Sequence, residues 1–394
     1  MATVVLVAGC AIDASDGDDE GKADGTNSGK LRPVTAAERL TYLANAELWH
    51  ATDVPKMNLR QGQLGAVGYE ANPATTLVCR FVEPTEDKPG GHSPKFLCER
   101  TEDKKVLKVK YSRDELPQNA KLSINGEVYA EAVSTRLFWA LGFFADRQFA
   151  SKVNCNNCPS GDPFSVYSGS DSSRVPVREF RNTLMEDKLP GKKIEECVKR
   201  DSHDSTKCLQ TKEDQGWTWE ELVANSRAPK EQVDALRLLA AFVYHADNKA
   251  ANQRLLCVEI ASDGSCKQSL AMVQDLGTTF GERTAFSFSK ADLDAWRQQP
   301  VWKNAAKCQA NLSIHSLTLG GDLEDPIVSE AGRKFLADLL VQLTDAQIED
   351  LFRGARIDVK DPAVMDPAAR EALIAGWVAA FKDKRRQLVD NKCP

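Results

Sequence analysis

One short stretch of the chain places several reactive residue types close together. It reads His245, Asp247, Lys249 and Asn252 in the pattern H-x-D-x-K-x-x-N, and a Gln-Asp-Leu-Gly run containing Asp275 follows later in the chain. By itself, the first pattern is more often solvated charge on a surface, and the second is more often a simple turn. Their order along the chain, and the elements between them, make the combination informative.

The elements around this stretch follow from the spacing of apolar residues. Residues 230–244 have the periodicity of a buried helix that ends just before His245. Two strands, 254–260 and 269–273, flank a turn bordered by Cys257 and Cys266. The sequence therefore predicts that a buried helix leads into the reactive loop, and that a hairpin separates the loop from Asp275.

A β-rich region precedes these elements. Strands are predicted at 75–82, 95–98 and 106–111, and together they predict a small antiparallel sheet. Alternation in the third strand places Leu107, Val109 and Tyr111 on one face and two lysines, Lys108 and Lys110, on the other. A helix is predicted next, over residues 127–141, with Gly142 as its stop signal.

The reactive loop resembles the catalytic loop of the protein-kinase-like superfamily, and Asp-Leu-Gly is similar to that superfamily's D-F-G. The resemblance implies that Asp247 accepts the proton of the acceptor hydroxyl and that Lys249 contacts the transferring phosphate. It implies that Asn252 and Asp275 bind Mg²⁺ (or Mn²⁺) and that ATP is the phosphoryl donor.

The same resemblance assigns roles in the β-rich region. Lys110 is expected to reach the nucleotide phosphates, with Lys108 as the alternative, and Glu131 is expected to pair with it, with Glu127 as the second option. The predicted helix is similar to one in uncharacterised secreted bacterial kinase-like proteins. The chain has no G-x-G-x-x-G, so the loop containing Gly91 and His92 is expected to cover the phosphates.

Departures from the family pattern leave alternatives open. Ala246 replaces the usual arginine of the catalytic loop, which makes control by activation-loop phosphorylation unexpected. The favoured interpretation is a kinase-like transferase that moves the γ-phosphoryl group of ATP to an unidentified protein or small molecule. Adenylyl transfer would use the same residues. The alternative from another class is an inactive, kinase-shaped binding or scaffold protein.

The eleven cysteines indicate the compartment. Cys10 follows a short apolar run that resembles the lipobox of bacterial lipoproteins, so we expect cleavage and lipidation there. The others are even in number, and closeness in the sequence favours four disulfides: Cys79 with Cys98, Cys155 with Cys158, Cys197 with Cys208, and Cys257 with Cys266. Cys308 and Cys393 remain as the fifth pair. A zinc site at Cys155-x-x-Cys158 is the weaker alternative, because one such pair is half a site.

These observations predict an α+β, bilobal kinase-like fold, with a small antiparallel β-sheet lobe plus one helix and a larger, mainly helical lobe. The expected divisions are a signal peptide and lipobox at 1–10, a disordered linker at 11–34, an N-lobe with a leading helix at 35–150, and a C-lobe at 151–394 that begins with a loop-rich stretch up to about residue 225.

The composition limits the expected partners. The net charge of −6 lacks the basic footprint of a nucleic-acid binder. No later apolar stretch has the length of a membrane span, so we expect membrane attachment through the lipid anchor only. The chain is predicted to be a monomer in the bacterial cell envelope, on its periplasmic or extracellular side, with a nucleotide and an unidentified acceptor as its partners.

Overall fold

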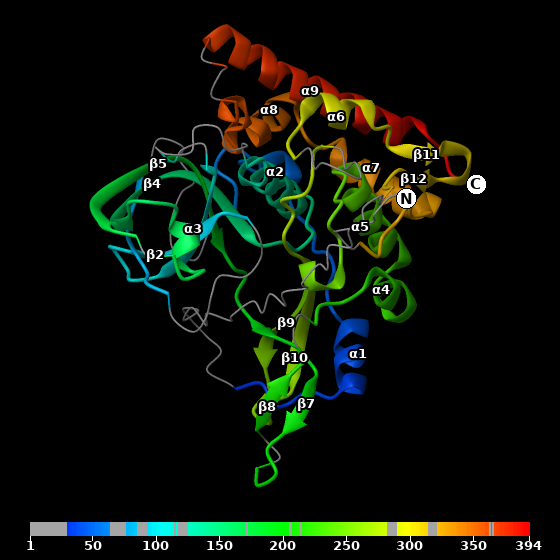
Figure 1. Ribbon diagram of the computed structural model, residues 1–394. Coiled ribbons are helices and arrows are strands. Elements are labelled where there is room, and N and C mark those ends of the chain that lie inside the picture. The colour runs from blue at the N-terminus through cyan, green and yellow to red at the C-terminus, as the bar shows by residue number, and fades with distance from the viewer. Residues whose placement is uncertain are drawn as a thin grey trace, which may run out of the picture.

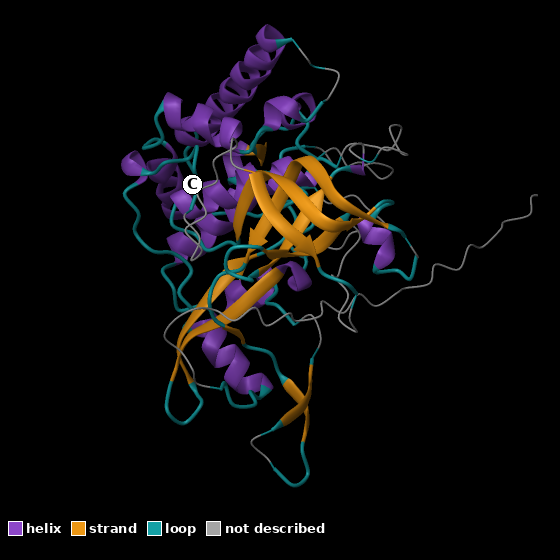
Figure 2. Cartoon of the chain, turned by 90° about the vertical axis from the view of Figure 1, so that its left-hand side faces the viewer, coloured by secondary structure: helices purple, strands orange, loops and turns teal. Residues whose placement is uncertain are grey.

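The computed structural model has a mixed α+β architecture (Figures 1 and 2). It describes residues 30–63, 76–84, 93–113, 116, 125–170, 172–204, 207–212, 215–281, 290–313, 321–361, 364 and 366–394. The helices are α1 (Ala36–Ala44), α2 (Glu127–Ala140), α3 (Pro163–Val166), α4 (Trp219–Asn225), α5 (Lys230–Phe242), α6 (Leu293–Gln298), α7 (Glu330–Leu340), α8 (Asp345–Gly354) and α9 (Pro367–Asp390).

The largest sheet is a closed barrel with the strand order β1-β2-β3-β5-β4. Its strands are β1 (Thr76–Phe81), β2 (Lys95–Arg100), β3 (Val106–Tyr111), β4 (Arg147–Pro159) and β5 (Arg174–Asp187). Neighbouring strands are antiparallel, except that β1 and β4 pair in parallel and close the barrel. Leu107, Val109 and Tyr111 lie in its core, so the predicted alternation of β3 is confirmed.

The barrel is larger than the predicted sheet. The three predicted strands are confirmed, but the expectation of a loop-rich stretch from residue 151 is wrong where β4 and β5 run. β4 also crosses residue 150, where the sequence analysis divides the chain. The strand pattern of β4 is hard to recognise in the sequence because its second half is rich in polar residues. Asn154, Asn156 and Asn157 are only partly buried, and they obscure the alternation that places Val153 and Cys155 in the core.

The remaining strands form smaller sheets. β9 (Gln253–Ile260) and β10 (Cys266–Val273) form the predicted hairpin, extended by β6 (Lys192–Lys193). β7 (Cys197–Arg200) pairs with β8 (Cys208–Thr211), and this hairpin projects away from the helices at the bottom of Figure 1. β11 (Trp302–Asn304) pairs with β12 (Gln309–Ala310).

Helix α2 lies between the barrel and the helical part of the molecule. Its buried residues occupy every side, from Val128 and Glu131 to Ala132 and Phe138, so it is not an ordinary amphipathic surface helix. One side contacts β4 and β5, and another contacts α8. A helix enclosed in this way can hold a charged side chain such as Glu131 away from water.

The two helices whose bounds the sequence predicts, α2 and α5, begin at the predicted residue and end within two residues of the predicted one. Capping boxes open α1 (Thr35 with Glu38) and α8 (Thr344 with Gln347). The packed chain starts before α1, since Arg32 donates its amide to Gly264 and Val34 is buried. The end of the predicted linker is therefore part of the fold.

Five disulfides join the predicted cysteine pairs. They are Cys79–Cys98, Cys155–Cys158, Cys197–Cys208, Cys257–Cys266 and Cys308–Cys393. The zinc alternative at Cys155 and Cys158 is thereby wrong. Five disulfides indicate an oxidising compartment, outside the reducing cytosol. Among the described residues, no helix has the length and apolar character needed to cross a membrane.

Candidate functional site

Lys110 and Glu131 form a buried ion pair between the barrel and α2. Lys110 Nζ lies 2.7 Å from Glu131 Oε2, and the two side chains are 4% and 1% exposed. Gln148 on β4 donates to the other carboxylate oxygen of Glu131 at 3.1 Å. The expected partners Lys110 and Glu131 are thus brought together, and Gln148, for which the sequence carried no signal, fixes the rotamer of Glu131.

Asp275 approaches the same lysine from the loop after β10. Its Oδ1 lies 3.2 Å from Lys110 Nζ, and its side chain is 45% exposed, so it lies at the solvent-facing edge of the cluster. Burial opposes the charge of Lys110, but Asp275 and Glu131 raise its pKa well above normal. Lys110 in turn lowers the pKa of Asp275. Both groups are therefore ionised at neutral pH.

The backbone at Asp275 is held in an unusual conformation. Its φ is +52°, in the left-handed region that residues other than glycine rarely adopt. The amide of the preceding residue, Gln274, donates to the carbonyl of Asn252 at 2.9 Å. The loop that follows β10 is thereby tied to the end of the reactive loop, and the turn directs Asp275 toward Lys110.

The reactive loop, residues 245–252, is fixed from within. Asn252 Nδ2 donates to the carbonyl of Asp247 at 2.7 Å, which bends the loop around Asp247. Lys249 Nζ lies 3.6 Å from Asp247 Oδ2. Asp247 Oδ1 is buried without a hydrogen-bond partner, and burial raises the pKa of this carboxyl group. A carboxylate with a raised pKa is a better proton acceptor.

Further backbone contacts join the two loops. Ala246 donates its amide to Thr278 at 3.0 Å, and Phe280 donates to Val243 at 2.8 Å. Burial is the main cause of the raised pKa of Asp247, and the negative charge of Asp275 adds to it. The structure therefore places the predicted residues of both loops in one neighbourhood, next to the Lys110–Glu131 pair.

Glu127 has a structural role rather than the pairing role kept open for it. Ser93 and Lys290 both donate to its carboxylate. A Cβ atom at Gly277 would lie 2.9 Å from Glu127 Cγ, so the third position of Asp-Leu-Gly has no room for a side chain. The first turn of α2 and the loop carrying Asp275 are in direct contact.

Lys108, the alternative to Lys110, has a different partner. Its Nζ lies 2.7 Å from Glu186 Oε2 on β5. Lys95, on β2, lies opposite Lys110 in the register of the two strands and is 5% exposed. Sequence reasoning did not assign Lys95 a role, although the antiparallel pairing of β2 with β3 could have shown that these lysines share a face.

Some predicted residues lie outside the part of the chain that the structure describes. These are Cys10, Gly91 and His92. Among the described residues, no group of three or more His, Cys, Asp or Glu side chains could hold a metal ion. The predicted metal ligands, one asparagine and one aspartate, are too few to form such a group.

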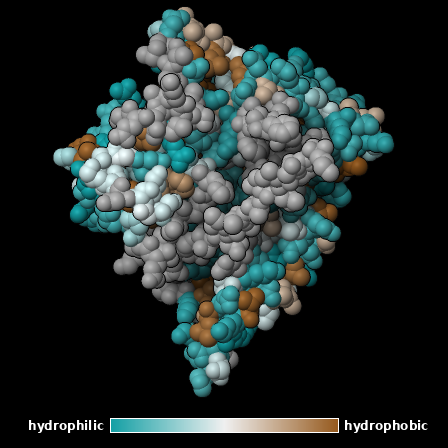
Figure 3. All heavy atoms as spheres, in the orientation of Figure 1, coloured by the Kyte–Doolittle hydropathy of each residue, from teal (hydrophilic) through white to brown (hydrophobic). Residues whose placement is uncertain are grey.

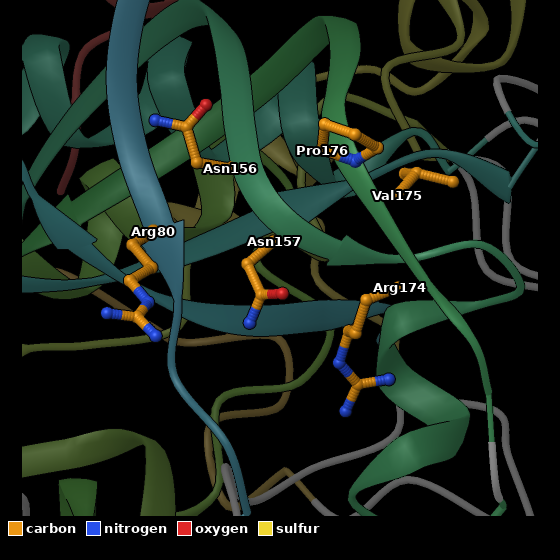
Figure 4. Close-up of a pocket in the computed structure, with 6 residues that line it drawn as sticks. All are labelled: Arg80, Asn156, Asn157, Arg174, Val175 and Pro176. Carbon is orange, nitrogen blue, oxygen red and sulfur yellow. The ribbon is translucent and has the colours of Figure 1, made fainter.

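A pocket of about 480 Å³ lies elsewhere, on the outer surface of the barrel. Arg80 of β1, Asn157 of β4 and Arg174 of β5 lie across it in a row (Figure 4). Arg174 is paired with Glu83 through both terminal carboxylate oxygens. This pocket contains none of the predicted residues and has no group suited to proton transfer.

The coloured part of the face shown in Figure 3 is predominantly polar. In Figure 3, teal residues cover most of the coloured face, and brown residues are scattered among them. Exposed apolar side chains include Val198 and Leu209 on the β7–β8 hairpin and Val177 on β5. Exposed apolar side chains of this kind are ordinary for a folded protein.

No known family model matches the sequence, and no curated protein matches it. Among solved structures, the chain is similar to the proinflammatory kinase CtkA of Helicobacter pylori, with a TM-score of 0.41 and 11% sequence identity. The match covers 80% of this chain and 97% of the other. A likeness at this level does not establish a family.

Proposed function

We propose that the chain is an envelope-anchored, kinase-like phosphotransferase that binds ATP with Mg²⁺ or Mn²⁺. The observation that carries the proposal is the convergence of Lys110, Glu131 and Asp275 from three distant segments. In a bilobal kinase-like fold, the barrel with α2 forms one lobe, and the mainly helical part forms the other. The disulfides support an envelope location, where lipidated Cys10 is the anchor.

The residues fit a divalent cation on chemical grounds. Mg²⁺ prefers oxygen ligands and commonly takes one or two from the protein, with the rest from phosphates and water. Asn252 uses its amide nitrogen to hold the carbonyl of Asp247, and its amide oxygen would be the atom that binds the cation. The carboxylate of Asp275 would supply the second oxygen ligand. The cation would neutralise charge on the phosphates.

The reaction follows from these positions. The acceptor hydroxyl oxygen attacks the γ-phosphorus of ATP. The bond between the γ-phosphorus and the oxygen that bridges the β- and γ-phosphates breaks, so that ADP leaves. The acceptor's proton passes to Asp247, whose Oδ1 has no other partner. Lys110 and Lys249 hold phosphate oxygens. Because the transition state is loose, positioned positive charge is the main requirement.

Nucleotide binding by the purified full chain is the first test. Thermal shift with ATP and Mg²⁺ should raise the melting temperature, since a ligand at 100 times its Kd stabilises by about 2.7 kcal/mol. Asp275→Asn should abolish most of the metal-dependent part. Asp294→Asn, at a position that is 80% exposed on α6, is the matched control and should behave as wild type. No shift with any nucleotide would favour the inactive scaffold.

Catalysis is tested separately through Asp247. Asp247→Asn should bind Mg·ATP as wild type does but form ADP about 10²- to 10⁴-fold more slowly, because the proton acceptor is gone. The measurement is ADP release in the presence of small hydroxyl acceptors and of water alone. Unchanged ADP formation in Asp247→Asn would remove the role assigned to this carboxylate.

A further inference from the structure

Three lysines share the outer face of the barrel beside the candidate site. Lys108 and Lys110 are two residues apart on β3, so their side chains point to the same side. Lys95 pairs with Lys110 across the β2–β3 ladder, which places it on that side as well. β2 is tied to α2 at its beginning, because Ser93 donates to Glu127.

Lys95 lies where a further positive charge, beside those of Lys108 and Lys110, is unfavourable. It is buried, and burial together with the charges of Lys108 and Lys110 lowers its pKa to about 8. Asp275 and Glu186 are the carboxylates that act in the opposite direction. Lys108 and Lys110 each lie 2.7 Å from a carboxylate, which keeps both amines positively charged. An anion beside Lys95 would relieve this repulsion.

The sequence context indicates which anion. The chain lacks G-x-G-x-x-G, whose backbone amides would otherwise surround nucleotide phosphates. Lys95 opens β2 directly opposite Lys110, whose amine lies 3.2 Å from the carboxylate of Asp275. A lysine amine can supply at this point the positive charge that a glycine-rich loop supplies through its amides.

We propose that Lys95 is a second phosphate-binding lysine, which contacts the polyphosphate of the nucleotide alongside Lys110. The inference rests on the proposed function and deepens it: the site selects ligands by their phosphate chain, with one lysine from each of two paired strands. It predicts a strong preference for nucleoside di- and triphosphates over nucleosides.

The test compares Mg·ATP with adenosine by isothermal titration calorimetry on the full chain. Lys95→Met should weaken Mg·ATP binding about 10- to 100-fold, the range expected for one charge-assisted contact, and should leave adenosine binding unchanged. Lys95→Arg should retain most of the affinity. Lys104→Met, at a turn position that is 70% exposed, is the matched control and should bind Mg·ATP as wild type does.

The outcomes separate the two proposals. Wild-type affinity for Mg·ATP in Lys95→Met would overturn the inference and leave the proposed function intact. Equal losses for Mg·ATP and adenosine would also overturn it, because they indicate a packing role. If folded wild-type protein binds no Mg·ATP, the proposed function fails and the inference fails with it. Should Lys95→Met not fold, Lys95→Gln provides the same comparison.

Discussion

At the scale of single residues, the reactive loop depends on side chains that face inward. Asn248 is fully buried: its amide donates to the carbonyls of His245 and Leu323, and its oxygen accepts the amide of Leu323. These bonds join the loop to a segment far along the chain. A buried side chain with every polar group satisfied makes the loop rigid, which is what a positioned proton acceptor such as Asp247 requires.

His245 is buried in a different way, because neither ring nitrogen has a hydrogen-bond partner. Burial lowers its pKa to about 4. The unfolded chain therefore binds more protons at this residue than the folded chain between pH 6.5 and 4, and folding stability decreases as pH falls through that window. At pH 7 and above, the residue is neutral in both states and contributes no pH dependence.

We predict that His245→Phe reduces acid sensitivity. Between pH 6.5 and 5, wild type should lose about 2 kcal/mol more free energy of unfolding than the variant, since one pKa unit corresponds to about 1.4 kcal/mol. Urea unfolding at the two pH values measures the difference. Parallel losses in the two proteins would show that His245 is not the titrating group.

At the scale of elements, helix α2 connects the barrel to both candidate loops. Its first turn contacts the loop after β10 through Glu127 and Gly277. One turn further, Glu131 contacts Lys110 on β3 and Gln148 on β4. Beyond Glu131, Ser134 Oγ lies 2.6 Å from Thr279 Oγ1. A shift of α2 would therefore change the position of Lys110 relative to Asp275, so the helix sets the geometry of the whole cluster.

The contact at Gly277 makes a specific prediction. Gly277→Ala should lower the free energy of unfolding by about 1–3 kcal/mol, because its Cβ would overlap Glu127, whose carboxylate is held by Ser93 and Lys290. Urea denaturation provides the measurement. Gly161→Ala is the control, since its Cβ would meet only the side chain of Ser172, at 3.3 Å or more, and it should change stability little. Equal effects at both glycines would contradict the proposed overlap.

At the scale of the whole molecule, the disulfides differ in how much chain they enclose. Cys155–Cys158 spans three positions within one strand, whereas Cys308–Cys393 spans 85 and joins the β11–β12 region to the end of the chain after α9. A cross-link stabilises mainly by restricting the unfolded chain, so a longer loop gives a larger effect. The last disulfide is therefore expected to matter most for global stability.

We predict that replacing both Cys308 and Cys393 by alanine lowers the free energy of unfolding by about 4 kcal/mol. The same change at Cys155 and Cys158 should lower it by about 2 kcal/mol through the loss of loop closure in the unfolded chain. Equilibrium urea unfolding without reductant compares the two double variants. A larger loss for the Cys155 and Cys158 variant would mean that local packing in β4, rather than loop closure, dominates.

Local pattern determined much of this protein. Helix caps such as Thr35 with Glu38 depend on neighbours in the chain, and the alternation of Lys108 and Lys110 with Leu107 depends on the pleat of one strand. Three of the barrel's strands and the helix carrying Glu131 could be predicted for the same reason. The reactive loop and Asp275 could be found because their residues lie close together in short motifs.

Only the tertiary structure decided how these pieces combine. Closure of the barrel depends on β1 meeting β4, a contact between strands far apart in the sequence, and the partly buried asparagines of β4 hid that strand. Barrel closure and the burial of α2 placed Lys110 beside Glu131 and Lys108 beside Glu186. Such choices between equivalent side chains depend on distances across the folded molecule, which spacing along the chain does not contain.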